Sequence, residues 1–295
     1  MSEASMKKFA KPAILLATVI WGSSFVVMKD TLSVVPVFFL LAVRFCSSAV
    51  VLAVVFWRKW RTEMNLSHLV RGVAMGVLLF LAYIAQTFGL TGTTPGNNAF
   101  LTASYCVIVP FLYWISYKKR PDKFNVAAAL VCIVGIGFVS LKSDLTMGWG
   151  DGLTLVGGFF FAAHILAVAK SAQGHDIFLL TALQFATAGV LAVICSLVFD
   201  VMPEGSIAAA APALAYLTLF CTAGALLLQS IGQKYTEPSQ ASVLLTLESV
   251  FGTMLAIGLG YESPTALNYF GFLLIFGAVI LSETKLSFLK RRVSP

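Results

Sequence analysis

Long apolar runs follow one another along nearly the whole chain of 295 residues. Each run has about 17 to 25 residues, which is the length that an α-helix needs to cross roughly 30 Å of hydrocarbon. Only 11% of the residues are charged and the mean hydropathy is +0.90, so the composition is unlike that of a soluble domain. We identify ten runs with short connections: 12–29, 36–57, 69–90, 95–117, 124–141, 152–170, 177–199, 210–231, 238–260 and 267–283.

These runs lack the alternation of apolar and polar residues that is typical of membrane β-barrel strands. Because lipid offers no hydrogen-bond partners, the spanning segments must then be helices. We predict an all-α integral membrane protein with ten transmembrane helices and no room for a soluble domain. The first run follows Lys7, Lys8 and Lys11 as in a signal peptide, but no small-residue cleavage site is evident, so we expect it to remain as the first helix.

Lys and Arg residues are distributed unevenly over the connections. With ten spans, the side of the membrane that carries the N-terminus receives Lys7, Lys8, Lys11, Arg58, Lys59, Arg61, Arg71, Lys118, Lys119, Arg120, Lys123, Lys170, Lys234, Lys285, Lys290, Arg291 and Arg292. The opposite side receives only Lys29 and Lys142. Basic connections stay in the cytoplasm, so we predict a bacterial-type plasma (inner) membrane protein with both termini cytoplasmic. This asymmetry accounts for the net charge of +7, and no nucleic-acid partner is expected.

The cysteines indicate neither a disulfide nor a metal site. All five lie inside apolar runs and show no C-x-x-C spacing: Cys46, Cys106, Cys132, Cys195 and Cys221. We interpret them as small apolar residues. No G-x-x-x-x-G-K-[ST] phosphate loop is present, which argues against a primary pump. We therefore expect no metal and no cofactor.

One segment of the chain occurs twice. Residues 86–105 match residues 229–248 without a gap, at an offset of 143 (229 minus 86). Gln, Gly, Thr, Pro and Leu residues coincide: Gln86 with Gln229, Gly89 with Gly232, Thr93 with Thr236, Pro95 with Pro238, and Leu101 with Leu244. Residues 38–45 match 178–185 at an offset of 140 (178 minus 38). Two generic apolar segments would also align by composition, but immersion in lipid does not demand the matched polar residues. We interpret the chain as two copies of one unit.

An odd number of spans in each copy places the second copy upside down relative to the first. We predict two inverted five-helix repeats, residues 1–145 with helices one to five and residues 146–295 with helices six to ten. Such repeats enclose a site near the midplane and support alternating access. The fourth helix of each copy begins with capping residues and a proline, at Thr93-Thr94-Pro95 and Thr236-Glu237-Pro238. These starts either attract an anionic group or act only as caps.

Two charged residues lie deep inside predicted spans, where each costs on the order of 2.5 to 3.5 kcal/mol or more. Glu248 lies near the middle of helix nine and either binds and releases a coupling proton or is a static partner of an arginine or hydroxyl. Arg44, near the middle of helix two, requires a buried acceptor. Candidates for it are Glu248, backbone carbonyls or an anionic substrate group. In the repeat, Arg44 corresponds to Gln184 and Glu248 to Tyr105, so the charges break the symmetry.

Polar and aromatic side chains near the helix breaks are candidates for substrate binding. This set contains Trp21, Tyr83, Gln86, Asn97, Asn98, Tyr105, His164 and Gln229. Some of them are expected only to bond neighbouring helices. His164 is either a hydrogen-bonded packing residue or a contact for substrate or proton. Trp21 either stacks on the substrate or faces lipid.

Several motifs occur in a fixed order: WGSSF from Trp21, AVRF around Arg44, TTPGNNAFLTASY from Thr93, then Pro110 and Glu248. In this order, and over nearly the whole length, the chain resembles the EamA family of the drug/metabolite transporter superfamily. The resemblance implies five plus five inverted helices, a cavity lined mainly by helices one, three, four, six, eight and nine, and transport of small metabolites. Many members have a Trp-small pair in helix six, where this chain has Phe161-Ala162. The resemblance therefore does not select among amino acids, amines and sugars.

We predict a secondary-active transporter of a small organic metabolite, an amino acid or a similar solute. Its partners would be that small molecule, the lipid bilayer and, as an open alternative, a second copy in a homodimer. A transporter of amines, drugs or sugar-type metabolites is the main alternative. A membrane-embedded enzyme is disfavoured, because H-E-x-x-H, G-x-S-x-G and paired-carboxylate motifs are absent. A structural or receptor role would leave the duplication unexplained.

Overall fold

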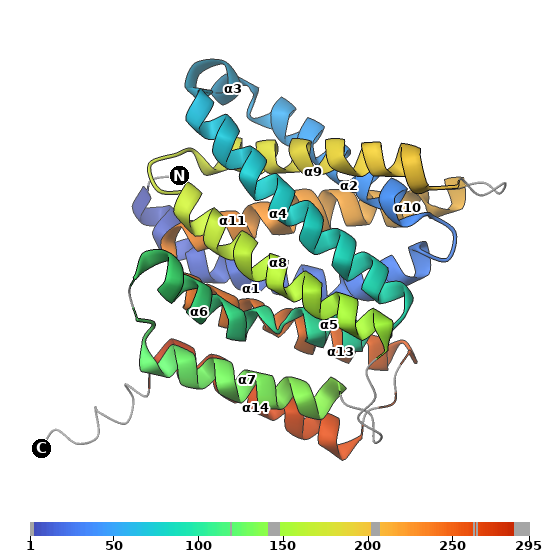
Figure 1. Cartoon of the computed structure of the whole chain (residues 1–295), viewed down its shortest axis with the longest axis vertical. Helices are drawn as coiled ribbons and strands as arrows, with labels where there is room; N and C mark the ends of the chain where they lie inside the picture. The colour runs from blue at the N-terminus through green and yellow to red at the C-terminus, as the bar shows by residue number, and fades with distance from the viewer. Residues whose placement is uncertain are drawn as a thin grey trace, which may run out of the picture.

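The computed structural model describes residues 3–118, 120–140, 148–201, 207–261, 263 and 265–285. All regular secondary structure in these ranges is helical, and the helices lie side by side in one bundle (Figure 1). The first part of the chain forms α1 (Glu3–Thr31), α2 (Val37–Val55), α3 (Trp57–Glu63), α4 (Leu66–Thr91), α5 (Pro95–Thr102), α6 (Tyr105–Tyr117) and α7 (Lys123–Ser140).

The second part repeats this order with one irregular helix. It forms α8 (Trp149–Ser171), α9 (Ile177–Phe199), the 3-10 turn η1 (Ile207–Ala210), α10 (Ala211–Tyr216), the π-helical segment η2 (Leu217–Gly224), α11 (Ala225–Tyr235), α12 (Pro238–Leu245), α13 (Leu247–Gly258) and α14 (Ala266–Thr284). Segments η1 to α11 follow one another without a gap and form one irregular helix. The matching stretch of the first copy is the regular helix α4.

Within the described ranges, eight helical segments are long and apolar enough to cross a membrane. These segments are Met6–Thr31, Val37–Val55, Leu66–Thr91, Pro95–Tyr117, Trp149–Ser171, Ile177–Phe199, Ile207–Tyr235 and Pro238–Gly258. The prediction of an all-helical, multi-pass membrane protein is therefore confirmed. Two of the ten predicted spans correspond to shorter apolar helices, Lys123–Gly135 and Ala266–Ala278. The predicted boundary at 145/146 lies outside the described residues, as do Lys119, Lys142, Lys290, Arg291 and Arg292.

The predicted fourth and ninth helices are each broken in two, which differs from the continuous runs that we expected. The first break lies at Ala103 and Ser104, and the second at Thr246, which is 143 residues after Ala103. At both breaks the backbone tightens into bonds of the i to i−3 type, such as Cys106 N–H to Ala103 C=O and Ser249 N–H to Thr246 C=O. The two copies therefore share a helix break at positions that contain neither Gly nor Pro.

Only one of the two predicted proline starts is capped by a side chain. Thr94 accepts a hydrogen bond from Asn97 N–H, and Pro95 occupies the first turn of α5. Glu237 precedes Pro238 in the same way but makes no capping hydrogen bond. The carboxyl of Glu237 is consequently available for another role.

Close helix contacts occur at glycines that the repeat relates. A Cβ atom on Gly89 of α4 would lie 2.2 Å from Thr154 Oγ1 and 2.8 Å from the Gly150 carbonyl oxygen of α8. On Gly232 of α11 it would lie 2.6 Å from the Ala10 carbonyl oxygen and 2.4 Å from Ile14 Cγ1, both of α1. The contact of α4 with α8 is therefore equivalent to the contact of α11 with α1. In these contacts Ala10 of α1 corresponds to Gly150 of α8, and Ile14 corresponds to Thr154. Residues of α1 and α8 thus correspond at an offset of 140 (150 minus 10), which we call the register of 140.

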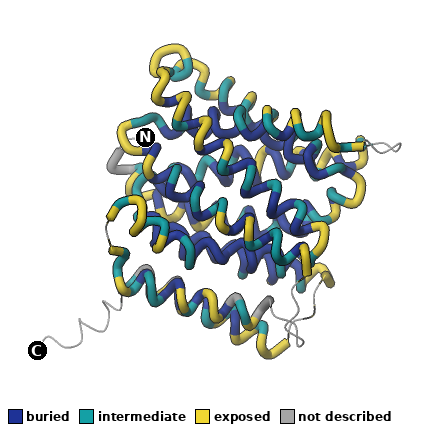
Figure 2. The backbone as a smooth tube through the Cα atoms, in the orientation of Figure 1, coloured by how far each residue is buried: buried dark blue, intermediate teal, exposed yellow. Residues whose placement is uncertain are grey.

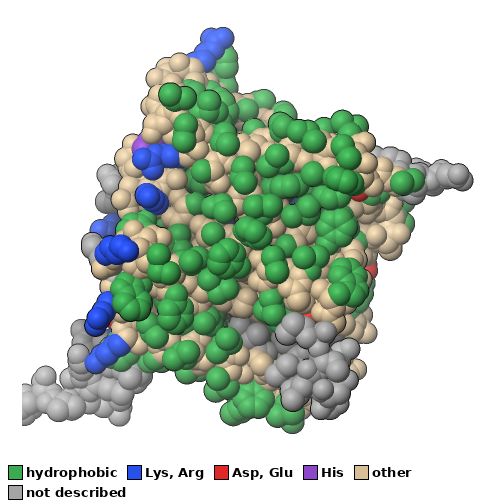
Figure 3. Space-filling model, in the orientation of Figure 1, with side chains coloured by type: hydrophobic (Ala, Val, Ile, Leu, Met, Phe, Trp, Pro, Cys, Tyr) green, Lys and Arg blue, Asp and Glu red, His purple; other side chains and the backbone are tan. Residues whose placement is uncertain are grey.

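The middle of the bundle is buried and its outer surface is apolar. Buried residues concentrate on the central helices (Figure 2), whereas hydrophobic side chains cover the outer face (Figure 3). Such a surface suits contact with lipid. On this face Lys and Arg side chains gather along one edge, the edge at which the N-terminus lies (Figures 1 and 3). The five cysteines are free, in keeping with apolar packing.

Candidate functional site

A cavity lies in the middle of the bundle, between helices of both copies. Its volume is about 30 Å³, which leaves room for one or two water molecules. Its walls are formed by Trp21, Ser24, Phe25, Met28, Arg44, Tyr83, Gln86, Tyr105, Phe161, Ile165, Gln229, Leu245 and Glu248. Seven of the ten residues predicted from the sequence are among them: Trp21, Arg44, Tyr83, Gln86, Tyr105, Gln229 and Glu248.

The other three predicted residues lie outside the cavity wall. Asn98 is fully buried and its Nδ2 donates to Gln86 C=O and to Thr154 Oγ1, so it ties α5 to α4 and α8. Asn97 lies in the first turn of α5, and its N–H donates to the cap of that helix. His164 is fully buried and its Nε2 lies 2.8 Å from Gln184 Oε1. The contacts of Asn98 and His164 join helices to one another.

Lining residues of the cavity come in pairs that the repeat relates. Gln86 and Gln229 are one such pair, at the offset of 143. With the register of 140 between α1 and α8, Trp21 corresponds to Phe161 and Phe25 to Ile165. Phe25, Phe161 and Ile165 were missed as site residues. For Phe161, the correspondence to the predicted residue Trp21 was a signal that could have found it.

Glu248 lies in the first turn of α13, two residues after the break at Thr246, and is 6% exposed. Tyr105, immediately after the break in the first copy, donates its hydroxyl to Glu248 Oε1 at 2.9 Å. A continuous helix would place both side chains at a different angle around its axis. The breaks therefore set the direction of this carboxyl and of the phenol that bonds it.

Arg44 enters the cavity from α2 and is 1% exposed. Its Nε donates to Thr222 Oγ1 at 2.9 Å, one η-nitrogen lies 3.3 Å from Met28 Sδ, and its guanidinium lies 5.1 Å from the centre of the Tyr83 ring. Within the described chain, no carboxylate lies within 4.0 Å of it, so Arg44 and Glu248 do not form an ion pair. The guanidinium has five N–H donors, and these contacts engage only two of its nitrogens.

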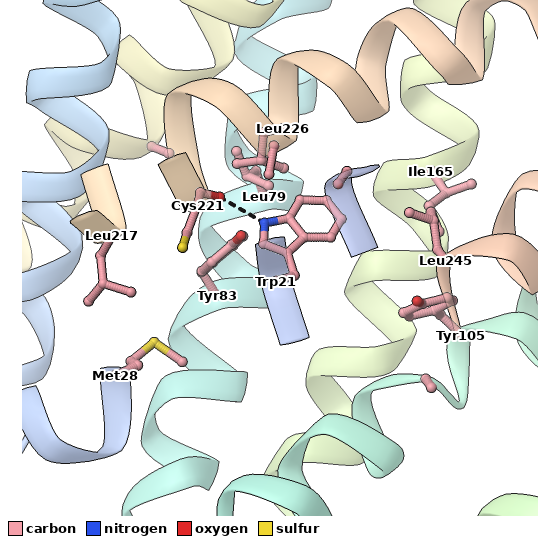
Figure 4. Close-up of a cluster of buried hydrophobic side chains, with 14 of the residues drawn as sticks. Trp21, Met28, Leu79, Tyr83, Tyr105, Ile165, Leu217, Cys221, Leu226 and Leu245 are labelled. Carbon is pink, nitrogen blue, oxygen red and sulfur yellow. Dashed lines mark hydrogen bonds between the residues drawn. The ribbon is translucent and has the colours of Figure 1, made fainter. Parts of the chain in front are cut away.

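The π-helical segment η2 supplies acceptors to the site. Figure 4 shows the Trp21 indole beside Tyr83, with its Nε1–H donated to Cys221 C=O at 2.7 Å. Thr222, the next residue, accepts from Arg44, and Ser48 donates to Thr218 C=O. The Cys221 and Thr218 carbonyls of η2 thus accept hydrogen bonds from side chains of α1 and α2. π-Helical segments are frequent at functional sites. Trp21 is only 6% exposed, which excludes the lipid-facing alternative.

The chain is similar to several known proteins. The EamA-like transporter family model matches it twice, over residues 9–141 and 148–284. One uncharacterized transporter of Archaeoglobus fulgidus is 31% identical over 284 residues, covering 95% of this chain and 87% of that protein. Another from the same organism is 26% identical, covering 92% and 96%.

A solved crystal structure shares the fold, with a TM-score of 0.76, 18% identity and full coverage of both chains. The family matches account for most of the described helices, and the relatives are transporters by name. This multi-pass membrane protein belongs to the EamA-like transporter family.

Proposed function

We propose that this protein is a secondary-active transporter of a small zwitterionic metabolite, such as an amino acid, and that it works by alternating access around the central cavity. The observation that carries the proposal is the presence of Arg44 and Glu248 in one cavity without an ion pair between them. Two buried charges of opposite sign attract strongly in a medium of low dielectric. Holding them apart is costly unless a ligand or a proton compensates them.

A zwitterion has the complementary pair of charges. Its carboxylate would take N–H groups of Arg44 other than those that contact Thr222 and Met28, because planar carboxylates suit the guanidinium fork. Its ammonium would take Glu248, beside the Tyr105 hydroxyl. A proton and an ammonium compete for the same carboxylate, so Glu248 would exchange one for the other as the cavity changes sides. This competition is the coupling step that we propose.

The volume of about 30 Å³ is too small for a metabolite, since ligand sites typically measure about 300 to 1,000 Å³. Binding would therefore require the two copies to move apart at the cavity. Two inverted five-helix repeats, residues 1–145 and 146–295, would provide this movement. The paired lining residues, such as Gln86 with Gln229, support this arrangement.

We further propose that both termini face the cytoplasm of a cell with a bacterial-type plasma membrane. The gathering of Lys and Arg along the edge of the N-terminus supports this orientation (Figure 3). An amine transporter is the second candidate function. The rings of Trp21, Tyr83 and Phe161 beside Glu248 would suit a cation without a carboxylate.

Uptake by proteoliposomes tests the proposal. Purified protein would be reconstituted and supplied with radiolabelled amino acids, amines and sugars under an imposed pH gradient. We expect accumulation of at least one zwitterion, recovered chemically unchanged, and collapse of that accumulation when a protonophore removes the gradient. Protein-free vesicles and vesicles with heat-denatured protein are the controls. Absence of flux for every zwitterion, or covalent change of the solute, would contradict the proposal.

A further inference from the structure

A second cavity opens at the end of the bundle where α11 ends and α12 begins. We call it the vestibule, and its volume is about 500 Å³, enough for a small metabolite. It lies between α1, α6, α8 and the α11–α12 connection. The residues that matter below are Lys7, Ala169, Gln233, Lys234, Thr236 and Glu237.

Buried polar atoms of the vestibule lack partners in the described chain. Gln233 is 2% exposed, yet neither its Oε1 nor its Nε2 is hydrogen-bonded. Thr236 is 8% exposed and its Oγ1 is also without a partner. These atoms have almost no exposed surface themselves, although their residues line the vestibule. Native proteins rarely leave buried amides and hydroxyls unsatisfied, so such groups beside a cavity indicate a polar partner supplied from it.

The repeat provides a filled counterpart of this site at the other end of the bundle. There the ammonium of Lys29, from α1, donates to Leu90 C=O at 2.7 Å and to Thr93 C=O at 2.8 Å, at the end of α4. Thr93 Oγ1 also donates to Asp151 at 2.6 Å. The C-terminal carbonyls of a helix lack internal partners and carry the negative end of its dipole, so they suit a cation.

The vestibule is formed by the equivalent residues of the second copy, but it has no lysine at the position equivalent to Lys29. Gln233 and Thr236 are the equivalents of Leu90 and Thr93 at the offset of 143. Ala169 is the equivalent of Lys29 at the register of 140, and it lines the vestibule. The next residue, Lys170, is exposed and does not line it. An ammonium group therefore fills the site at one end, and an open cavity occupies the equivalent place at the other.

We propose that the vestibule binds the ammonium group of a small solute, with the C-terminal end of α11, the Gln233 amide and the Glu237 carboxylate as its acceptors. Glu237 adds a carboxylate beside Thr236, at the position where the counterpart site has the neutral Thr94. Lys7 and Lys234 line the same cavity, and their positive charges would bind an anionic group of the same solute. A solute with both groups is a zwitterion.

The vestibule also leads toward the central cavity. Gln229 lies four residues before Gln233 on α11, hence on the same face of the helix, and it lines the central cavity. Its Oε1 and the neighbouring Ser230 Oγ are unpaired as well. Unsatisfied polar groups of α11 thus lie at both cavities, at Gln229 and at Gln233. The role of the vestibule as a loading site for the central cavity rests on the proposed function, whereas its preference for ammonium does not.

Thiol labelling measures that preference without any transport. Ala169→Cys would be treated with 2-aminoethyl methanethiosulfonate, a cation, and with the 2-sulfonatoethyl reagent, an anion. The thiolate attacks the reagent sulfur and releases methanesulfinate, so intact mass reports the rate of each reaction. Lys170→Cys is the matched control outside the vestibule, and the unsubstituted chain gives the background of the native cysteines.

We expect the ratio of cation to anion rates at Ala169→Cys to exceed that at Lys170→Cys by about tenfold, as one partly exposed charge at short range would produce. Adding Glu237→Gln to Ala169→Cys should remove most of that excess. An equal or lower ratio at Ala169→Cys, or no reaction with either reagent, would overturn the proposal.

A second variant tests loading. Ala169→Lys places a tethered ammonium where Lys29 lies at the other end, and should slow exchange of a transported amino acid by about tenfold or more relative to Ala169→Met, which has similar bulk and no charge. If labelling shows the cation preference while exchange is unchanged, the vestibule binds ammonium but does not load the cavity. If no amino acid is transported by the unsubstituted chain, only the proposed function fails.

Discussion

Tyr105 donates a hydrogen bond to Glu248, and the two residues occupy the same position in the two copies of the repeat, 143 residues apart. In the inverted repeat that we propose, equivalent residues can touch only near the axis that relates the copies, because the operation that superposes the copies exchanges them. The carboxyl of Glu248 therefore lies where the two halves meet. A proton gained or lost there acts on both halves at once, which suits a coupling role.

Glu248→Gln should abolish accumulation of substrate driven by a pH gradient, because the amide cannot bind and release a proton. Exchange of labelled for unlabelled substrate should continue with a raised KM, since the amide oxygen still accepts a hydrogen bond from an ammonium. Proteoliposome uptake and exchange measure the two activities on one preparation. Tyr105→Phe, which removes only the phenol partner, should retain accumulation. Unchanged accumulation in Glu248→Gln would exclude this residue as the coupling site.

Arg44→Gln should weaken the binding of L-alanine by about 10- to 100-fold, the loss expected for a charge-assisted hydrogen bond of about 1.5 to 3 kcal/mol. Ethylamine differs from L-alanine by the missing carboxylate, and its binding should be unaffected. Thermal shifts, each referred to the ligand-free variant, report both affinities. Equal losses for the two ligands would mean that Arg44 acts through the shape of the cavity and not through a carboxylate.

The helical class and most of the cavity could be predicted from the sequence, since apolar length and buried polar residues are local signals. The breaks at Ala103 and Thr246 could not, because neither contains Gly or Pro. The π-helical segment η2 was likewise unpredictable, because its extra residue per turn is stabilised by contacts with Trp21 and Arg44 from distant helices. Only the folded bundle brings these groups together.

Not every predicted site residue lines the cavity. The reason is the orientation of the side chain around the helix axis. Asn98 was grouped with Gln86 because both are polar and close to a helix end. In the structure the Asn98 side chain turns to the α4–α8 contact and bonds Thr154. Sequence position gives the depth of a residue along a helix, but the face it presents depends on the exact start of α5 at Pro95.

Gly89→Ala should destabilise the protein by about 1 to 3 kcal/mol, because the new methyl group would overlap Thr154 Oγ1 and the Gly150 carbonyl in a packed contact. Gly152→Ala, on α8 between Gly150 and Thr154, is the matched control. A Cβ there meets nothing within 4 Å, so alanine should add about 0.5 to 1 kcal/mol of helix stability. Thermal melts in detergent compare the two. Equal Tm values would show that α4 and α8 do not pack closely at Gly89.

Glu237→Gln should raise the Tm at neutral pH in the absence of ligand. Burial raises the pKa of the Glu237 carboxyl, Lys285 opposes this and Asp122 adds to it. A carboxyl whose pKa is raised in the folded state costs stability once it ionises, so glutamine removes a cost that exists above that pKa. The gain should shrink as the pH falls through the folded pKa and vanish below the unfolded one. Melting curves across this range test the sign, and a gain that grows toward acid would contradict it.

Lys29→Met should loosen the end of the bundle that Lys29 closes. The stem of the side chain is kept, but the bonds to the carbonyls of Leu90 and Thr93 are lost. Each charge-assisted bond contributes about 1.5 to 3 kcal/mol, so opening at this end should become at least about tenfold more frequent.

The measurement uses the background Leu90→Cys, in which the thiol replaces a fully buried side chain. The rate at which this thiol reacts with the small, neutral methyl methanethiosulfonate reports how often this end opens. Lys29→Arg keeps the positive charge and should react as slowly as the parent. If Lys29→Met leaves the rate at Leu90→Cys unchanged, the ammonium does not hold this end closed, and the sealed counterpart of the vestibule depends on packing alone.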